Sequence, residues 1–228
     1  MRLKLIATAA ASAVILIGMT AAPAQASHAW GPYHWKTTTG TSNLTIYSSL
    51  TSDWTGSLSV ANSDWNASAQ LQNTVVPGAT TLASRKQCTP SAGAVRVCNA
   101  SYGANGWAGL ASIWSSDGTH ISQGTAKMND TYEAGSPAAE RQGVMCQEVG
   151  HDFGLAHQDE NFTNPNLGTC MDYTNDWSTN QHPNAHDYNQ LDTMYNHVEA
   201  AAASQPASTT GVTRIKTGNV VTMVTWAS

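Results

Sequence analysis

The sequence predicts an α+β domain that combines short strands from its first half with two longer helices from its second half. Three observations predict it. Residues 43–47 alternate polar and apolar side chains, as a half-buried strand does. Residues 106–114 form an apolar run of strand length that contains glycines. Residues 184–198 place apolar side chains at roughly helical spacing, which predicts an amphipathic helix that closes the domain.

Residues 1–26 have the pattern of a secretory signal peptide. The basic residues Arg2 and Lys4 precede an apolar run over residues 5–22, and small residues lead to Ala26, after which we expect cleavage. A membrane anchor is the competing interpretation. The run is at the short end for a bilayer span and a cleavage-like site follows it at once. We therefore expect a secreted, extracellular protein with no membrane partner.

The composition favours one soluble catalytic-size domain. We assign it to residues 27–200, and we assign residues 201–228 to a linker followed by a strand-like C-terminal tail. The formal net charge is −5 and only 11% of the residues are charged. Such a chain lacks the basic surface that nucleic acid requires. We expect a monomer that does not bind nucleic acid.

The remaining elements follow in chain order. An aromatic N-terminal arm precedes the first strand, and a first helix is expected within residues 57–72. The expected later elements are a second strand over 74–82 broken at Pro77-Gly78, a third over 94–98, an extended segment over 120–132 and a long helix that starts at Ala138. Glu140 in the first turn of that helix suits its positive end.

The four cysteines fit an exported protein with two disulfides. Three pairings are possible. We favour Cys88–Cys98, which closes a short loop, and Cys146–Cys170, which ties the long helix to the segment after it. A four-cysteine metal site is the alternative, and the lack of any Cys-x-x-Cys pair disfavours it.

The segment 147–157 reads Gln-Glu-x-x-His-x-x-Gly-x-x-His. Residues four apart on a helix project from one face, so Gln147 and His151 could share a metal, with Glu148 beside them. Gly154 can adopt a left-handed conformation without steric cost, which would end the helix and turn the chain back. The reversal would bring His157 to the same point. This pattern predicts a metal centre.

With a methionine after this segment, the chain resembles the metzincin clan of zinc endopeptidases, in particular the matrixin-like and snapalysin-like secreted enzymes. The matching residues are 147–157 and Cys170-Met171-Asp172-Tyr173, which is similar to the clan's Met-turn. The resemblance covers roughly residues 40–200. It implies a zincin-like single domain, with a mixed twisted sheet packed on a long active-site helix and a C-terminal helix. It also implies that residues 125–129 form the edge strand that pairs with substrate.

The resemblance implies a role for each matching residue. His151 and His157 become ligands of Zn²⁺, and Glu148 becomes the general base. Met171 becomes the hydrophobic base of the metal pocket, and Tyr173 a polar contact near the substrate. The implied reaction is hydrolysis of a peptide bond in a protein or peptide by a zinc-activated water.

Gln147 departs from the clan's pattern, which has histidine at this position. Three interpretations stay open. Gln147 ligates the metal directly, or Asp159 completes the site, or the site holds metal poorly and no longer catalyses. We favour Gln147 as the third ligand in a working enzyme. The alternative function is a secreted, non-catalytic pseudoenzyme that binds metal or protein.

Four other histidines, His120, His182, His186 and His197, are isolated in the sequence. Isolated histidines are more often surface or capping residues than ligands, so we do not predict a second metal site from them. The chain has no Gly-x-Ser-x-Gly motif and no phosphate-binding loop, which argues against a serine hydrolase or a nucleotide enzyme.

Overall fold

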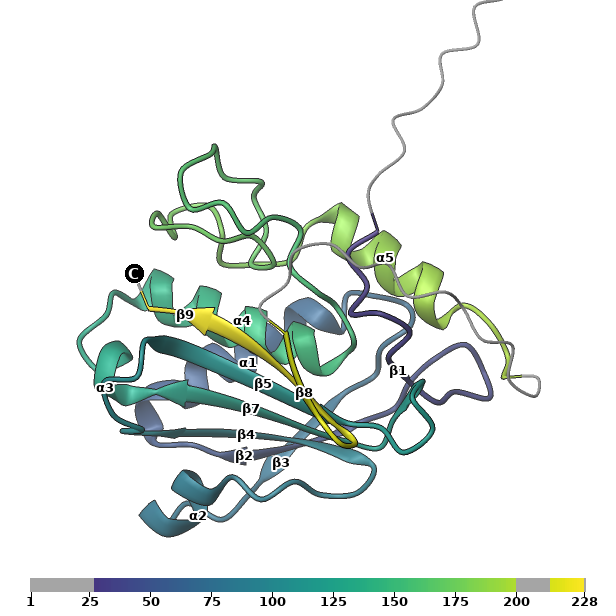
Figure 1. The fold of residues 1–228 in the computed structure, drawn as a ribbon, viewed down its shortest axis with the longest axis horizontal. Helices are drawn as coiled ribbons and strands as arrows, with labels where there is room; N and C mark the ends of the chain where they lie inside the picture. The colour runs from purple at the N-terminus through teal and green to yellow at the C-terminus, as the bar shows by residue number, and fades with distance from the viewer. Residues whose placement is uncertain (1–26, 200–213, 228) are drawn as a thin grey trace, which may run out of the picture.

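The computed structural model describes residues 27–199 and 214–227 (Figure 1). The predicted signal peptide, over residues 1–26, and most of the predicted linker lie outside the described residues. Within the described part of the chain, no helix has the length and apolar character needed to cross a membrane.

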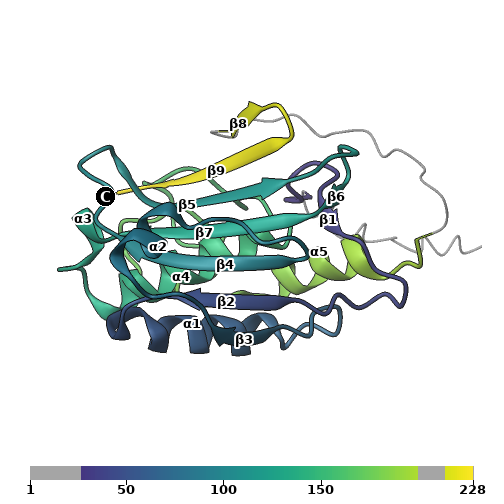
Figure 2. The same cartoon turned by 90° about the horizontal axis from the view of Figure 1, so that it is seen from below.

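The described residues form a seven-stranded mixed sheet and a small two-stranded one. The strands of the large sheet, in spatial order, are β3 (Thr74–Pro77), β2 (Thr45–Ser49), β4 (Ala94–Ala100), β7 (Gln123–Asn129), β5 (Trp107–Trp114), β9 (Val220–Trp226) and β8 (Arg214–Thr217). Figure 2 shows this order. The four strands from β3 to β7 are parallel, and β5, β9 and β8 each run antiparallel to the preceding neighbour. The small sheet pairs β1 (His34–Trp35) with β6 (His120–Ile121).

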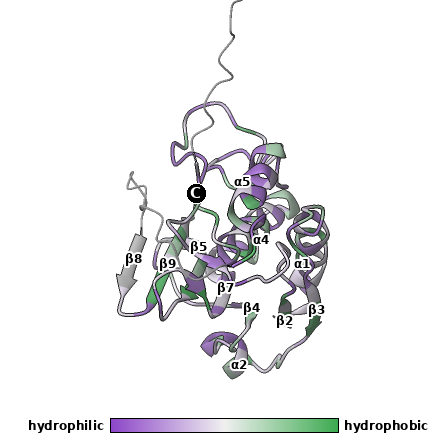
Figure 3. Cartoon of the chain, turned by 90° about the vertical axis from the view of Figure 1, so that its right-hand side faces the viewer, coloured by the Kyte–Doolittle hydropathy of each residue, from purple (hydrophilic) through white to green (hydrophobic). Residues whose placement is uncertain are grey.

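Helices lie on both sides of the large sheet. They are α1 (Ser52–Trp65), α2 (Leu82–Gln87), α3 (Asp130–Glu133), α4 (Ala138–Asp152) and α5 (Ala185–Tyr195). Figure 3 shows α1 and α4 on one face and α2 on the other. This arrangement of a mixed sheet on a long helix, with a further helix near the end of the domain, is the α+β fold that the sequence predicted.

The core lies between the sheet and α4, and α1 packs beside α4. One face of α1 buries Trp54, Leu58, Ala61 and Trp65, which recur at helical spacing. The indole nitrogen of Trp65 donates a hydrogen bond to the carbonyl of Cys146 in α4, at 3.1 Å. This contact satisfies a buried indole and fixes α1 against the helix that carries the predicted metal segment.

Four local predictions were wrong. The first helix, expected within residues 57–72, is α1 (Ser52–Trp65), and residues 130–132, expected to be extended, belong to α3. Residues 80–82 are not part of a strand, because Thr81 caps α2 by accepting a hydrogen bond from the backbone N–H of Ser84. Residues 125–129 belong to β7, which lies inside the sheet between β4 and β5 and is therefore no edge strand. The strand that packs against Glu148 is β5, the antiparallel neighbour of β7, because a Cβ at Gly109 of β5 would lie 2.3 Å from Oε1 of Glu148.

Both favoured disulfides are confirmed. Cys88 pairs with Cys98 and Cys146 pairs with Cys170. The second bridge joins the middle of α4 to the segment that contains Met171. Met171 is fully buried next to Gly150 of α4, where an added Cβ would lie 2.7 Å from the methionine sulfur.

Candidate metal centre and active site

The chain reverses at the end of α4, as predicted. The helix ends at Asp152, and Gly154 follows with a φ of +89°, in the left-handed region that favours glycine. A Cβ at Gly154 would lie 2.1 Å from the carbonyl oxygen of Tyr33, so the close approach of the N-terminal arm also requires glycine. After this turn, Leu155 and His157 lie back against the helix.

The turn brings His151 and His157 together. Their Nε2 atoms are 3.0 Å apart and both side chains are buried. The Nδ1 atom of His151 lies 2.8 Å from the carbonyl oxygen of Leu155, and that of His157 lies 3.1 Å from Oε1 of Glu160. A carbonyl can only accept, so the His151 Nδ1 carries the proton and its Nε2 presents a lone pair to His157.

If His157 carries its proton on Nε2, it donates to His151. If it carries the proton on Nδ1, towards Glu160, the two Nε2 lone pairs converge on one point where a metal ion could bind. Protonation is disfavoured, because burial lowers the pKa of His151 well below its ordinary value and the nearby His157 lowers it further. Burial, helped by His28, likewise lowers the pKa of His157 to about 3. Histidine ligands of zinc are neutral, and each usually donates its other ring N–H to an oxygen acceptor. The Nδ1 atoms of His151 and His157 face such acceptors, so these two residues fit the ion.

Glu148 lies on the side of α4 that faces the sheet. Its carboxyl packs against Gly109 of β5, where a Cβ would lie 2.3 Å from Oε1 of Glu148. Burial raises the pKa of Glu148 to about 8, although Thr225 and the backbone of Ala111 act in the opposite sense. The side chain has no exposed surface. In this arrangement the carboxyl is largely protonated at neutral pH.

Gln147 is fully buried, and its amide oxygen accepts a hydrogen bond from the hydroxyl of Thr225 in β9. Asp159, the other candidate for a third ligand, accepts hydrogen bonds at both carboxylate oxygens, from the backbone of Asn161 and the side chain of Asn164. Thus both candidates already have hydrogen-bond donors. The structure brings His151 and His157 together and places Glu148 one helical turn from His151.

The C-terminal strand β9 covers this region. It pairs with β5 along its whole length, antiparallel (Figure 1). The Tyr173 hydroxyl donates a hydrogen bond to the carbonyl of Val224 at 2.8 Å, and the Tyr173 ring packs on His157 with centroids 4.3 Å apart. Strand β9 therefore lies between β5 and the segment that follows His157.

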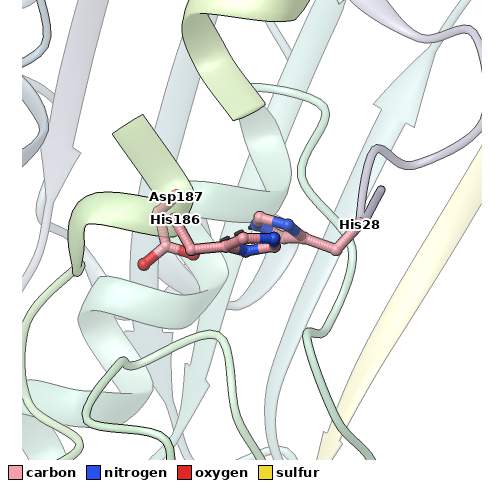
Figure 4. Close-up of side chains that lie close together, drawn as sticks. All are labelled: His28, His186 and Asp187. Atoms are coloured by element: carbon pink, nitrogen blue, oxygen red, sulfur yellow. Dashed lines mark ion pairs between the residues drawn. The ribbon is translucent and has the colours of Figure 1, made fainter. Parts of the chain in front are cut away.

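The N-terminal arm covers the other side. The indole of Trp30 lies edge-on to His151, with ring centroids 5.9 Å apart. His28 stacks on His186, and its Nε2 lies 3.0 Å from the carboxylate of Asp187 at the start of α5 (Figure 4). These three side chains could hold a metal ion. The Asp187 carboxylate, however, also binds Gln158, Thr169 and the backbone of Asn184, so it serves as a structural anchor.

Sequence reasoning did not identify several of these neighbours. Glu160 is three residues from His157, and that spacing could have suggested the contact. Nothing in the sequence places His28 or Thr225 near residues 147–157, because both are more than 60 residues away in the chain.

No family model and no curated protein matches this sequence. Among solved structures, the chain is similar to high choriolytic enzyme 1, a hatching enzyme zinc-protease from Oryzias latipes (medaka fish). The identity is 10% and the TM-score 0.40, over 72% of this chain and 94% of that one.

Two structures of myroilysin are also similar. One has 12% identity and a TM-score of 0.43, over 71% of this chain and 86% of that one. The other has 14% identity and a TM-score of 0.41, over 71% and 96%. Identities and TM-scores this low carry no information about the function of this chain.

Proposed function

We propose that the protein is a secreted zinc-dependent endopeptidase whose C-terminal strand covers its active site. The observation that carries the proposal is the pair of buried, facing imidazoles of His151 and His157, with the buried carboxyl of Glu148 one helical turn from His151. A zinc ion bound there would supply a water of lowered pKa. The resemblance to metzincins supports the same roles.

In this proposal each side chain has one task. His151 and His157 hold the ion, with their Nδ1 atoms fixed by Leu155 and Glu160. Glu148, once ionised, takes a proton from the attacking water and returns it to the leaving amine. Gln147 is the proposed third ligand, through the amide oxygen that now accepts the Thr225 hydroxyl.

The covering strand has three consequences for activity. A substrate cannot reach Glu148 while β9 is in place, because Glu148 and Gln147 have no exposed surface. Departure of β9 would also release the amide oxygen of Gln147 and expose Glu148 to water, which would lower its pKa towards that of a working base. It would uncover the edge of β5, whose free backbone groups can pair with an extended peptide.

The test uses the full chain with a specific protease site inserted within residues 200–213. We expect the zinc-loaded protein to cleave a broad peptide library slowly before the cut and faster after it. Excess synthetic peptide of residues 214–228 should suppress the gain, whereas a scrambled peptide should not. The variant His151→Ala/His157→Ala is the control without the centre. No cleavage in any zinc-loaded form would reject the peptidase.

The same contacts favour a second candidate, a non-catalytic binding protein. Gln147 is already hydrogen-bonded and Glu148 is largely protonated, so in the covered form neither is ready for catalysis. A zinc-loaded protein that captures library peptides at the β5 edge without cleaving them would support this alternative.

A further inference from the structure

A second cluster of metal-binding side chains lies away from the α4 centre. Three histidines, His34, His120 and His197, surround the carboxylate of Glu199. The Nε2 atoms of His34 and His197 lie 2.9 and 3.3 Å from Oε1, and that of His120 lies 3.0 Å from Oε2. None of these residues takes part in the His151–His157 centre.

The fold itself brings these residues together. His34 in β1 and His120 in β6 are direct partners in the parallel pairing of the small sheet, so their imidazoles lie side by side. The segment after α5 carries His197 and Glu199. Its backbone joins the N-terminal arm through a hydrogen bond from the Glu199 N–H to the Thr37 carbonyl. Three distant segments thus meet at one point.

The acceptors that contact the Nδ1 atoms of these histidines favour a cation between the Nε2 atoms and the Glu199 carboxylate. Nδ1 of His34 lies 2.9 Å from the carbonyl oxygen of Pro32, which can only accept, so this Nδ1 carries a proton. In neutral His34 the Nε2 lone pair therefore faces a carboxylate oxygen. Two acceptors 2.9 Å apart require a proton or a metal ion between them. Asp117 holds Nδ1 of His120 in the same way, at 2.6 Å.

The spacing suits a small transition metal. Zinc binds imidazole nitrogen and carboxylate oxygen at about 2.0–2.2 Å, so tetrahedral donors lie about 3.3 Å apart. The donor atoms of His34, His197 and Glu199 all lie within 4.8 Å of one another. The Nε2 atoms of His34 and His197 lie 2.9 and 3.3 Å from Oε1 of Glu199, close to this separation. His197 is partly exposed, which leaves a route for the metal to enter.

We propose that His34, His197 and Glu199 bind a second zinc ion, and that His120 positions the Glu199 carboxylate through its other oxygen. The ion would join the N-terminal arm to the segment after α5, and His120 would link the connection between β5 and β7 to it through Glu199. Its role is structural, because the arm it fixes also carries Trp30 against His151. The inference does not depend on the proposed peptidase activity.

The experiment measures zinc bound per chain after equilibrium dialysis against zinc alone, and the zinc-dependent rise of the melting temperature. The background is the full-length variant His151→Ala/His157→Ala, which removes the α4 centre. It should still bind one zinc. Adding His197→Ala or Glu199→Gln should abolish that binding and most of the thermal shift. His120→Ala should lower the zinc affinity at least tenfold without abolishing binding, because the Glu199 carboxylate loses only the hydrogen bond that positions it.

The matched control is His182→Ala. His182 is also a histidine in an ion pair, with Asp64 at 2.7 Å, but it lies outside the cluster. This variant should keep the full zinc content and thermal shift. The inference is overturned if the α4-centre variant binds no zinc, in which case the cluster is a network of protonated histidines. Zinc at the cluster without peptide cleavage would reject only the proposed function.

Discussion

Glu148 illustrates how a single residue depends on its surroundings. Helix α4 presents it to the sheet at the one place in β5, Gly109, where the absence of a side chain leaves room for a carboxyl. Burial raises its pKa to about 8. The same carboxyl can be a general base only when water reaches it, so its role depends on whether β9 is in place.

Replacement of Glu148 by glutamine tests the base. The amide has nearly the same shape but cannot accept the proton, so we expect peptide cleavage to fall at least about 100-fold. Zinc content should change little. The free energy of unfolding at pH 7 should rise relative to the parent, because the parent glutamate ionises in the unfolded chain but stays largely protonated in the folded one. The measurements are library cleavage, metal analysis and denaturant unfolding. Unchanged cleavage by Glu148→Gln would remove Glu148 from the mechanism.

Variants of Gln147 and Asp159 identify the third ligand. If Gln147 ligates, Gln147→His should raise zinc affinity, since imidazole is the stronger donor, and should keep or increase cleavage. Gln147→Ala should then lower affinity, and Asp159→Ala should have little effect. If Asp159 ligates, the two alanine variants exchange their effects. Zinc titration of the three proteins gives the ranking, and equal affinities throughout would exclude both residues.

At the scale of elements, α4 is held from two sides. The bridge Cys146–Cys170 joins it to the turn that contains Met171, and Trp65 of α1 donates to the Cys146 carbonyl. The other bridge, Cys88–Cys98, joins the end of α2 to β4 on the opposite side of the sheet. The two disulfides therefore act on different parts of the molecule.

Removal of each bridge should have a different effect on function. Cys146→Ala/Cys170→Ala and Cys88→Ala/Cys98→Ala should each cost about 2–5 kcal/mol of unfolding free energy. Only the first pair should also lower zinc affinity at the α4 centre, because it frees the turn beneath the helix. Denaturant unfolding and zinc titration on the same samples measure both effects. Equal losses of zinc affinity would contradict this assignment.

At the scale of the whole molecule, buried acids make stability depend on pH. Glu133, at the end of α3, is buried, and its pKa is raised to about 7 by burial and by the nearby Glu140. An unfolded glutamate ionises near pH 4.3. As the pH rises from about 4 to 7, the unfolded chain loses this proton before the folded one does, so the folded state loses stability.

Glu133→Gln removes this dependence. We expect the variant and the parent to have similar unfolding free energies near pH 4, apart from a constant offset. The variant should gain on the order of 2 kcal/mol relative to the parent by pH 8. Denaturant unfolding at pH 4, 6 and 8 measures the difference. Parallel stability curves would show that Glu133 ionises at the same pH in both states.

The sequence by itself determined the local features of the protein. Spacing in residues 147–157 predicted that His151 and His157 meet, and Gly154 predicted the turn between them, because these depend on helix geometry over a few residues. The α+β class and both disulfides were also predicted. Periodicity misjudged residues 80–82, where a capped turn of helix replaces a strand.

Only the tertiary structure decided what surrounds these local features. It placed β5 rather than β7 beside Glu148 and brought Thr225 of the C-terminal strand onto Gln147. It also gathered His34, His120 and His197 around the carboxylate of Glu199. The sequence treated His120 and His197 as isolated. Such contacts join residues up to 165 positions apart. They follow from strand order and chain reversal, which a pattern of neighbouring residues does not encode.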